Sequence, residues 1–136
     1  MEKIISQALT FDDVLIRPGY SGFERSSISQ NTFITKNISL TCPIVSAPMD
    51  TVTEAPLATA LGRLGGLGFI HRNLTIPDQA AEVARVKAAG YKVGAAVGSS
   101  NGYEERVKAL VEAGVDIILV DSAHGYAKKV IDAVTY

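Results

Sequence analysis

Residues 43–55 read Pro-Ile-Val-Ser-Ala-Pro-Met-Asp-Thr-Val-Thr-Glu-Ala, and this stretch decides the fold. A short apolar run ends at Ser46, and a helix-start signal follows at once. Thr51 opens a capping-box pattern, but Thr53 is the favoured cap because it places Pro56 in the first helical turn. A proline is tolerated there, since its missing N–H would have no intrahelical partner in any case. The stretch therefore predicts a strand, a turn and a helix in succession.

The rest of the chain repeats this plan. Apolar runs typical of buried strands begin at positions 44, 67, 93 and 115, and amphipathic helix patterns separate them. A repeat of this length is typical of βα units, in which parallel strands follow one another through right-handed crossovers. Such units fit half of a (β/α)8 barrel and also a small doubly wound sheet, and composition does not decide between them. The expected helices run over 55–64, from a Thr75 cap to Gly90, from a Ser100 or Asn101 cap to Gly114, and over 127–134.

Residues 1–43 do not follow this rhythm, and we expect them to form an N-terminal extension packed against the βα body at 44–136. Residues 32–35 and 38–40 alternate apolar and polar side chains on either side of a short polar turn. Such alternation predicts a small antiparallel hairpin within the extension.

Length and composition limit the classes of protein that this chain can represent. With 136 residues, 47% of them hydrophobic and 20% charged, it suits one globular domain or part of one. A formal net charge of −1 argues against a nucleic-acid or anionic-membrane surface, and the apolar runs are too short to span a bilayer. The start lacks the apolar core of a signal peptide, and the cysteine and histidine spacing suits no metal. We therefore expect a cytoplasmic protein without a metal site in this chain.

Polar and titratable residues gather where the expected strands end. In parallel α/β folds, ligands bind at the carboxyl ends of the strands, so the loops there should converge on one site. This convergence locates a site without naming a reaction. The loops are 46–50, 71–73, 98–100 and 121–125.

Several residues in and near these loops have more than one interpretation. Asp121 either hydrogen-bonds the vicinal hydroxyls of a ribose or caps the helix that follows it. His124 is either an acid–base group or a loop-capping residue. His71 and Arg72 either bind an anion or form a solvated loop pair. Cys42 precedes the first strand, away from the expected site, and we expect a small buried hydrophobe there.

Five stretches, which follow one another along nearly the whole chain, carry a resemblance to a known family. They are Leu-Thr-Phe-Asp-Asp-Val-Leu at 9–15, the stretch at 43–55, Gly-Leu-Gly-Phe-Ile-His at 66–71, Val-Gly-Ala-Ala-Val-Gly at 93–98, and Val-Asp-Ile-Ile-Leu-Val-Asp-Ser-Ala-His-Gly at 115–125. Together they resemble the inosine-5′-monophosphate (IMP) dehydrogenase family. The resemblance implies an α/β fold, a (β/α)8 TIM barrel, of which this chain supplies an N-terminal extension and roughly the first four βα units. It also implies NAD-dependent oxidation of IMP to XMP in guanine nucleotide biosynthesis, through a covalent cysteine intermediate, in a homotetramer that uses K+.

The same resemblance implies roles for individual residues. Asp121 matches the aspartate that contacts the nicotinamide ribose of NAD, with Ser122 and Ala123 beside it. Met49, with Ala47 nearby, matches the segment that lies against the bound nucleotide. Some members of the family have serine at the position of Ala47, so a side-chain hydrogen bond from there is missing in this chain.

Two departures from the family pattern change what we expect of this chain. The regulatory pair of CBS modules has no room here, because residues 86–92 lead directly into the third strand. The family's catalytic cysteine loop, K+ loop, phosphate-binding loops and flap all correspond to positions beyond Tyr136. We therefore expect no catalytic residue in this chain, no activity from it alone, and a missing C-terminal half-barrel as its partner.

Two other functions stay open. GMP reductase, the sibling family that converts GMP to IMP with NADPH, also lacks CBS modules and is similar at residues 125–126. The dehydrogenase is favoured because residues 46–49 and 122–124 resemble it instead. The remaining alternative is a non-catalytic half-barrel that acts as a binding or assembly module. Its open sheet would expose strand edges at 44–46 and 115–120, so we expect the isolated chain to self-associate or to fold poorly.

Overall fold

A parallel sheet forms the centre of the molecule, which the computed structural model describes over residues 6–136. Its strands are β3 (Gly68–Ile70), β4 (Val93–Val97) and β5 (Ile117–Val120), hydrogen-bonded in that order. Each strand is parallel to its neighbour. The apolar runs of the sequence therefore form neighbouring strands in sequence order, as the βα repeat predicts.

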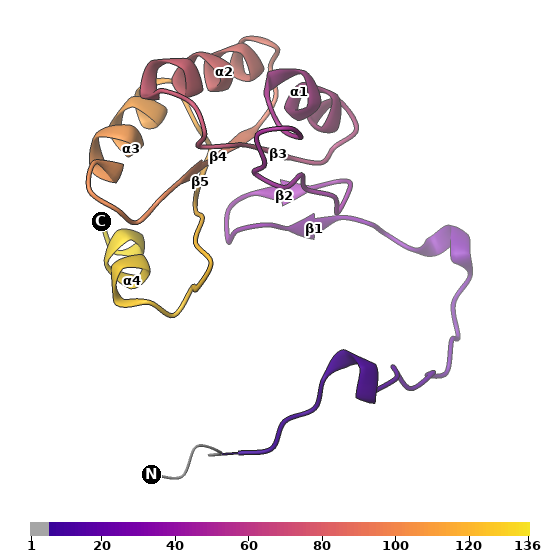
Figure 1. Cartoon of the computed structure of the whole chain (residues 1–136). Coiled ribbons are helices and arrows are strands. Elements are labelled where there is room, and N and C mark those ends of the chain that lie inside the picture. The colour runs from indigo at the N-terminus through magenta and orange to yellow at the C-terminus, as the bar shows by residue number, and fades with distance from the viewer. Residues whose placement is uncertain (1–5) are drawn as a thin grey trace.

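Helices alternate with these strands. The helices are α1 (Ala55–Arg63), α2 (Ile76–Ala88), α3 (Tyr103–Glu112) and a shorter α4 (Lys128–Val134). Figure 1 shows α1, α2 and α3 side by side on the outer side of the curved sheet, with α4 beyond β5. The described residues thus form a mixed α/β fold with an open parallel sheet.

The strand expected at 44–46 is reduced to a single bridge. Val45 pairs in parallel with Leu67, and backbone hydrogen bonds of 3.1 and 3.2 Å join residues 44–46 to Leu67. Pro43 and Pro48 lie on either side of this run, and a proline has no N–H with which to extend a ladder. The segment still lies beside β3, which keeps the sequential strand order.

Small and branched apolar side chains join the helices to the sheet. The main cluster of buried residues contains Ala55, Ala58, Ile70, Val83, Val86, Val93, Ala95, Val97 and Leu110. Gly68 lets α1 lie close to β3, because a Cβ at that position would come within 2.5 Å of Ala58. All residues of β4 are buried, which explains why this strand has no polar side chain.

The glycines that we expected to end helices do so. Gly65, Gly90 and Gly114 have φ angles of 87°, 84° and 88°, a left-handed conformation that glycine adopts without strain. The predicted cap of α2 is also confirmed, because Thr75 Oγ1 accepts a hydrogen bond from the Asp78 N–H at 3.3 Å. These helix ends are set by residues next to one another in the sequence.

The cap predicted for α1 is wrong. Thr53 is fully buried and donates its hydroxyl to the Ala47 carbonyl at 2.6 Å, so Glu54 occupies the N-cap position instead. The carboxylate of Glu82, on α2, accepts the Ala55 N–H at 2.6 Å. A side chain from the next βα unit therefore satisfies the helix start that a local threonine was expected to satisfy.

The cap predicted for α3 is wrong as well. The helix follows Gly102, which has a φ of 89°, and neither Ser100 nor Asn101 caps it with a side chain. The left-handed turn at Gly102 directs the chain straight into the helix. Ser100 contributes only its carbonyl, which accepts the Tyr103 N–H at 3.3 Å.

Within the part of the chain that the structure describes, residues 6–31 do not pack against the βα body. Phe11, Leu15 and Ile16 are each at least 96% exposed, and Figure 1 shows this part of the chain extending away from the sheet. The expectation of a packed extension is therefore wrong for residues 6–31. Its 3₁₀ turns, such as Phe11–Asp13, are too short to present an apolar face that could be buried.

The hairpin joins this segment to the body. β1 (Thr32–Phe33) and β2 (Ser39–Leu40) pair antiparallel, as the alternating pattern predicts. The N–H groups of Thr41 and Cys42 donate to the Gly65 carbonyl at 3.1 and 3.0 Å, which ties the hairpin to the end of α1. The division of the chain into two regions at residue 43 stays a prediction.

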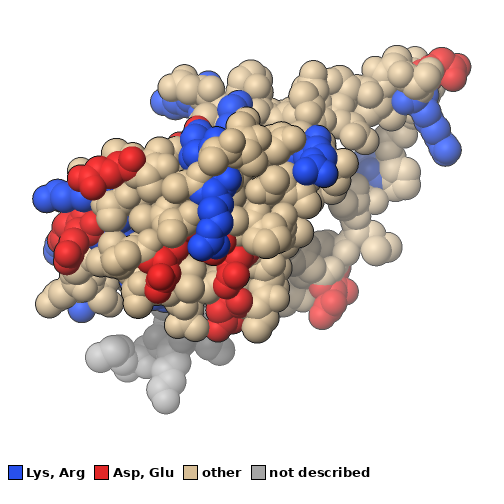
Figure 2. All heavy atoms as spheres, turned by 90° about the horizontal axis from the view of Figure 1, so that it is seen from above, with Lys and Arg blue, Asp and Glu red and all other residues tan. Residues whose placement is uncertain are grey.

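The surface carries charges of both signs. On the face shown in Figure 2, Lys and Arg side chains lie among Asp and Glu side chains. This mixing agrees with a formal net charge of −1. Among residues 6–136, none of the helices has the length and the hydropathy that crossing a membrane would require.

Candidate functional site

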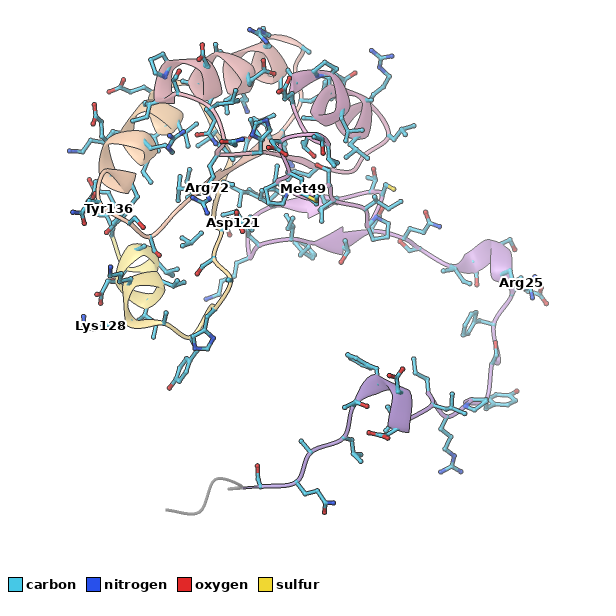
Figure 3. All side chains as sticks on the ribbon, viewed as in Figure 1. Arg25, Met49, Arg72, Asp121, Lys128 and Tyr136 are labelled. Carbon is cyan, nitrogen blue, oxygen red and sulfur yellow. The ribbon has the colours of Figure 1, made fainter. Side chains whose placement is uncertain are left out.

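The carboxyl ends of the strands surround an open cleft of about 380 Å³. The loop at 98–100 lies beside this cleft and contributes to a second cavity of about 310 Å³, which shares Arg72 with the first. Figure 3 shows the side chains of Met49, Arg72 and Asp121 gathered at this end of the sheet. The residues that line the cleft come from three loops: Pro48, Met49, Asp50, His71, Arg72, Asn73 and Asp121.

Asp121 follows β5 and lines the cleft. Its backbone N–H donates to the Val97 carbonyl at 2.8 Å, which continues the sheet by one residue. Its carboxylate accepts a hydrogen bond from Arg72 Nε at 3.3 Å, while the two side chains stay 40% and 49% exposed. The alternative that Asp121 caps a helix is wrong, because α4 begins only at Lys128 with Ala127 as its N-cap. One guanidinium therefore orients this carboxylate and leaves part of it open to the cleft.

The residues after Asp121 form a tight turn beside the cleft. Ser122 and Ala123 are exposed and do not line the cleft themselves. Ser122 Oγ accepts the backbone N–H of His124 at 3.3 Å. His124 is exposed, and its imidazole has no hydrogen-bond partner within residues 6–136, so the side-chain cap does not form. The alternative role of His124 as an acid–base group stays a prediction.

The turn at 47–53 presents Met49 to the cleft. The Met49 N–H donates to the Ala47 carbonyl at 2.9 Å, and the Met49 carbonyl accepts the N–H groups of Val52 and Thr53, both at 3.0 Å. The buried Thr53 hydroxyl closes the turn on Ala47. Because the Met49 side chain is 54% exposed, an apolar group is available at the cleft wall. Ala47 acts through its carbonyl, which holds the turn.

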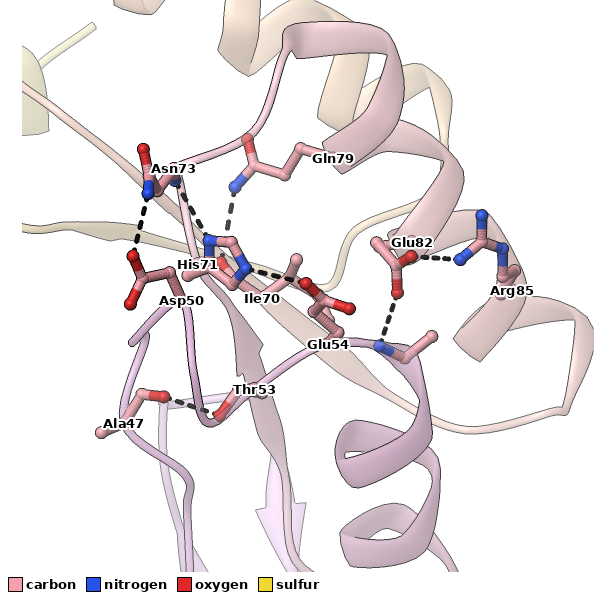
Figure 4. Close-up of polar contacts among 11 residues, drawn as sticks. Ala47, Asp50, Thr53, Glu54, Ile70, His71, Asn73, Gln79, Glu82 and Arg85 are labelled. Carbon is pink, nitrogen blue, oxygen red and sulfur yellow. Dashed lines mark hydrogen bonds and ion pairs between the residues drawn. The ribbon is translucent and has the colours of Figure 1, made fainter.

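His71 is buried and ties two loops together (Figure 4). Its Nδ1 accepts the Asn73 N–H at 3.1 Å, so the ring proton belongs on Nε2, which donates to Glu54 Oε1 at 3.2 Å. Asn73 Nδ2 also donates to Asp50 Oδ2 at 2.9 Å. Both residues of the pair that we considered for anion binding line the cleft, but His71 uses both ring nitrogens within the protein, whereas the Arg72 side chain is 49% exposed.

Buried Gln79 and partly buried Arg106 support the loops from behind. Gln79 is fully buried, and its Nε2 donates to the Ala96 carbonyl at 2.8 Å. Arg106 donates from Nη1 to Gln79 Oε1 at 2.8 Å and from Nη2 to the Leu74 carbonyl at 3.1 Å. Burial, followed by the charge of nearby Arg72, lowers the pKa of Arg106. The two guanidinium groups are thus close enough to affect each other.

Neither Gln79 nor Arg106 is among the predicted site residues. The available signal was the position of Gln79 on the buried stripe of α2, three residues before Glu82 and four before Val83. A polar side chain at such a position must find a hydrogen-bond partner. The sequence does not say which partner, because Arg106 comes from the next helix.

Cys42 lies at the amino end of the strand segment 44–46, away from the cleft. It is partly exposed, so the expectation of a buried residue is wrong. Within residues 6–136, no group of three or more His, Cys, Asp or Glu side chains is placed to hold a metal ion. The cleft has an apolar wall at Met49 and a polar wall at Arg72 and Asp121.

Fold and cleft together define a class of protein: α/β domains with a parallel sheet and a ligand site at the carboxyl ends of the strands. Within that class, the profile described as the IMP dehydrogenase / GMP reductase domain matches residues 8–136. The chain belongs to this family.

Individual relatives agree with the family match. An inosine-5′-monophosphate dehydrogenase of Cryptosporidium parvum is 36% identical over 172 residues, covering 95% of this chain and 42% of the relative. The enzyme of that name from Borreliella burgdorferi is 34% identical over 182 residues, covering 97% and 45%. That of Aquifex aeolicus is 58% identical over 87 residues, covering 64% and 18%. The chain thus spans less than half the length of these curated relatives.

Proposed function

We propose that this chain forms the first half of the (β/α)8 barrel of an IMP dehydrogenase, which oxidises IMP to XMP with NAD in guanine nucleotide biosynthesis. The observation that carries the proposal is that Met49 and Asp121 line one cleft, although they come from loops at opposite ends of the βα series. By resemblance, these residues contact the nucleotide and the nicotinamide ribose. Hydride transfer requires those two ligands to lie side by side.

The cleft residues fit a dinucleotide beside a mononucleotide. NAD, when bound, supplies the hydride acceptor. The oriented, partly exposed carboxylate of Asp121 suits a pair of ribose hydroxyls, because an ionised carboxylate only accepts hydrogen bonds. Ser122 and Ala123 are exposed beside it, so the cofactor can approach the main chain there. On the other wall, Met49, in the turn closed on Ala47, offers an apolar surface to the purine of IMP.

The arrangement of the helices supports a barrel. α1, α2 and α3 lie on one side of the sheet (Figure 1), whereas a doubly wound sheet carries helices on both faces. The strand segment 44–46 and β5 have open edges, which a C-terminal half-barrel would pair. We propose that half as the missing partner, in a cytoplasmic homotetramer.

The reactive groups would come from that partner half. Cys42 is away from the cleft, so this chain offers no cysteine to attack a substrate there. No described residue is proposed as a ligand of K+. The part of the reaction that belongs to this chain is therefore binding and orientation: Asp121 at the ribose and Met49 at the purine.

The proposal is tested by joining this chain to the C-terminal part of the Aquifex aeolicus relative. With IMP and NAD, we expect XMP and NADH, and we expect the Asp121→Ala variant to lose most of this activity. Conversion of GMP with NADPH instead would identify GMP reductase. The intact Aquifex enzyme is the positive control. If that control is active and the fusion acts neither on IMP with NAD nor on GMP with NADPH, the enzymatic proposal is contradicted.

A second candidate, a non-catalytic assembly module, rests on the open side of the molecule. Ile131 and Val134, on α4, are 47% and 69% exposed, next to the unpaired edge of β5. Sedimentation of the isolated chain tests this candidate. Concentration-dependent dimers would support it, and a monomer at all concentrations would exclude it.

A further inference from the structure

Two arginine side chains share the cavity beside the cleft. Its volume is about 310 Å³, and Arg72 lines both this cavity and the cleft that contains Asp121. The second arginine is Arg106, and most of the remaining lining residues are small or polar. The remaining lining residues are Ile76, Gly98, Ser100, Asn101, Gly102, Tyr103 and Glu105.

Among the described residues, Arg72 makes one hydrogen bond and keeps free donors. Its Nε donates to Asp121 Oδ2 at 3.3 Å. Its guanidinium lies against the backbone of Gly98, where an added Cβ would be only 3.2 Å from Nη1. Within residues 6–136, neither Nη1 nor Nη2 of Arg72 has a hydrogen-bond acceptor. The terminal N–H groups of Arg72 are therefore available to a ligand.

Arg106 is fixed on the other side of the cavity. Its hydrogen bonds to Gln79 and to the Leu74 carbonyl fix the position of the guanidinium. Both guanidinium groups line one cavity, and burial, followed by the charge of Arg72, lowers the pKa of Arg106. An anion placed between them would relieve the repulsion between these like charges.

We propose that Arg72 and Arg106 bind the diphosphate group of the dinucleotide whose ribose contacts Asp121, an inference that rests on the proposed function. The diphosphate is bonded to the same ribose through its 5′ carbon, so a ribose on Asp121 brings the diphosphate next to Arg72. A guanidinium presents paired N–H donors whose spacing matches phosphate oxygens. Arg72 thus acts twice, through Nε on Asp121 and through its terminal nitrogens on the ligand.

The surroundings of the arginine pair include one favourable and one opposing group. The ten-residue helix α3 begins at the cavity, and a helix N-terminus favours negative charge. Glu105, in the first turn of α3, is exposed, lines the same cavity and would repel an anion. The site therefore has a built-in control, because removing the charge of Glu105 should strengthen binding.

The test is a ¹⁵N NMR titration of the full chain with inorganic pyrophosphate, NAD and nicotinamide riboside. We expect Arg72→Ala to weaken binding of pyrophosphate and NAD roughly tenfold to a hundredfold, which is the usual range for one charged hydrogen bond. Nicotinamide riboside has no phosphate, so its binding should change far less. Glu105→Gln should tighten pyrophosphate binding about twofold to fivefold. Arg25→Ala is the matched control, because Arg25 lies far out on the N-terminal segment (Figure 3).

Arg106 needs a gentler variant, because removing its side chain also breaks the hydrogen bonds to Gln79 and Leu74. Arg106→Lys keeps the charge but loses the paired donors, and we expect a weakening of pyrophosphate binding of about threefold to tenfold. The amide spectrum of each variant reports whether the fold is kept.

Three outcomes decide the inference. If the folded wild-type chain does not bind pyrophosphate, or binds it as well without Arg72, the inference is overturned, while NAD binding through Asp121 can still stand. If Arg72→Ala weakens pyrophosphate binding and Asp121→Ala leaves NAD binding unchanged, the diphosphate site is supported and the proposed contact between Asp121 and the ribose is contradicted. If both variants weaken binding by the expected factors, the diphosphate site and the ribose contact are both supported.

Discussion

Two aspartates flank β5, and their contacts differ in a way that separates stability from function. At the amino end, Asp116 accepts two hydrogen bonds from Lys87 Nζ, at 2.9 and 2.8 Å, and a third from the Val93 N–H at 2.9 Å. At the carboxyl end, Asp121 accepts one side-chain hydrogen bond, from Arg72 at 3.3 Å. Asp116 is thus nearly saturated by the protein, whereas Asp121 keeps acceptor capacity.

Burial follows the same division. The Lys87 and Asp116 side chains are 34% and 23% exposed, against 49% and 40% for Arg72 and Asp121. A saturated, partly buried pair stabilises the fold and has little left to offer a ligand. An exposed, loosely held pair adds little to stability but can bind. This is the division expected between the two ends of parallel sheets in barrel enzymes.

The largest effect on stability should come from Asp116→Ala. The substitution leaves Lys87 and the Val93 N–H without their partner, so we expect the free energy of unfolding to fall by about 2–3 kcal/mol. Urea unfolding measures this loss, and Asp116→Asn, which can still accept from Val93, should lose less. The folded Asp116→Ala variant should bind NAD as the wild type does. Weaker binding would contradict the view that the amino end of the sheet serves stability alone.

A smaller loss is expected from His71→Ala. The variant loses the hydrogen bonds with Glu54 and Asn73, and the free energy of unfolding should fall by about 1–2 kcal/mol. Because these bonds join the loop after β3 to the turn before α1, hydrogen exchange should quicken at 47–54 before it does so elsewhere. Uniform quickening across the sheet would mean that His71 does not act on this turn in particular.

The smallest effect should come from Asn73→Ala. Its hydrogen bond to Asp50 is exposed, so we expect a change in the free energy of unfolding of at most about 0.5 kcal/mol. The variant should nevertheless alter the amide chemical shifts of Asp50 and Met49, since it frees one side of the cleft wall. Asn101→Ala, in an exposed loop, is the control. A loss as large as that of His71→Ala would contradict the view that the cleft end adds little stability.

The sequence was sufficient for several features that depend on neighbouring residues. The βα repeat, the helix ends at Gly65, Gly90 and Gly114, and the Thr75 cap are all local, and the structure has each of them. The gathering of polar loops also followed from the repeat, because parallel strands must all end on one side. Site residues came from the resemblance, and their roles remain predictions.

The cap of α3 failed for a local reason, the left-handed turn at Gly102, but other features that failed depend on contacts between distant units. Glu82, on another helix, accepts the Ala55 N–H at the start of α1, whereas the Thr53 hydroxyl donates to the Ala47 carbonyl. The hydrogen bond between Gln79 and Arg106 links two helices. The one sign of it in the sequence is a polar residue, Gln79, on the buried stripe of α2. Propensity rules score each segment alone, so they cannot anticipate a partner that folding brings from elsewhere.

We propose that Asp121 binds ligand, whereas Asp116 stabilises the fold. The most direct test compares NAD titration and urea unfolding for Asp121→Ala and Asp116→Ala in the full chain. We predict that Asp121→Ala weakens NAD binding at least about tenfold and changes the free energy of unfolding by less than about 0.5 kcal/mol. An Asp121→Ala chain that binds NAD as the wild type does, or that loses as much stability as Asp116→Ala, would contradict the account.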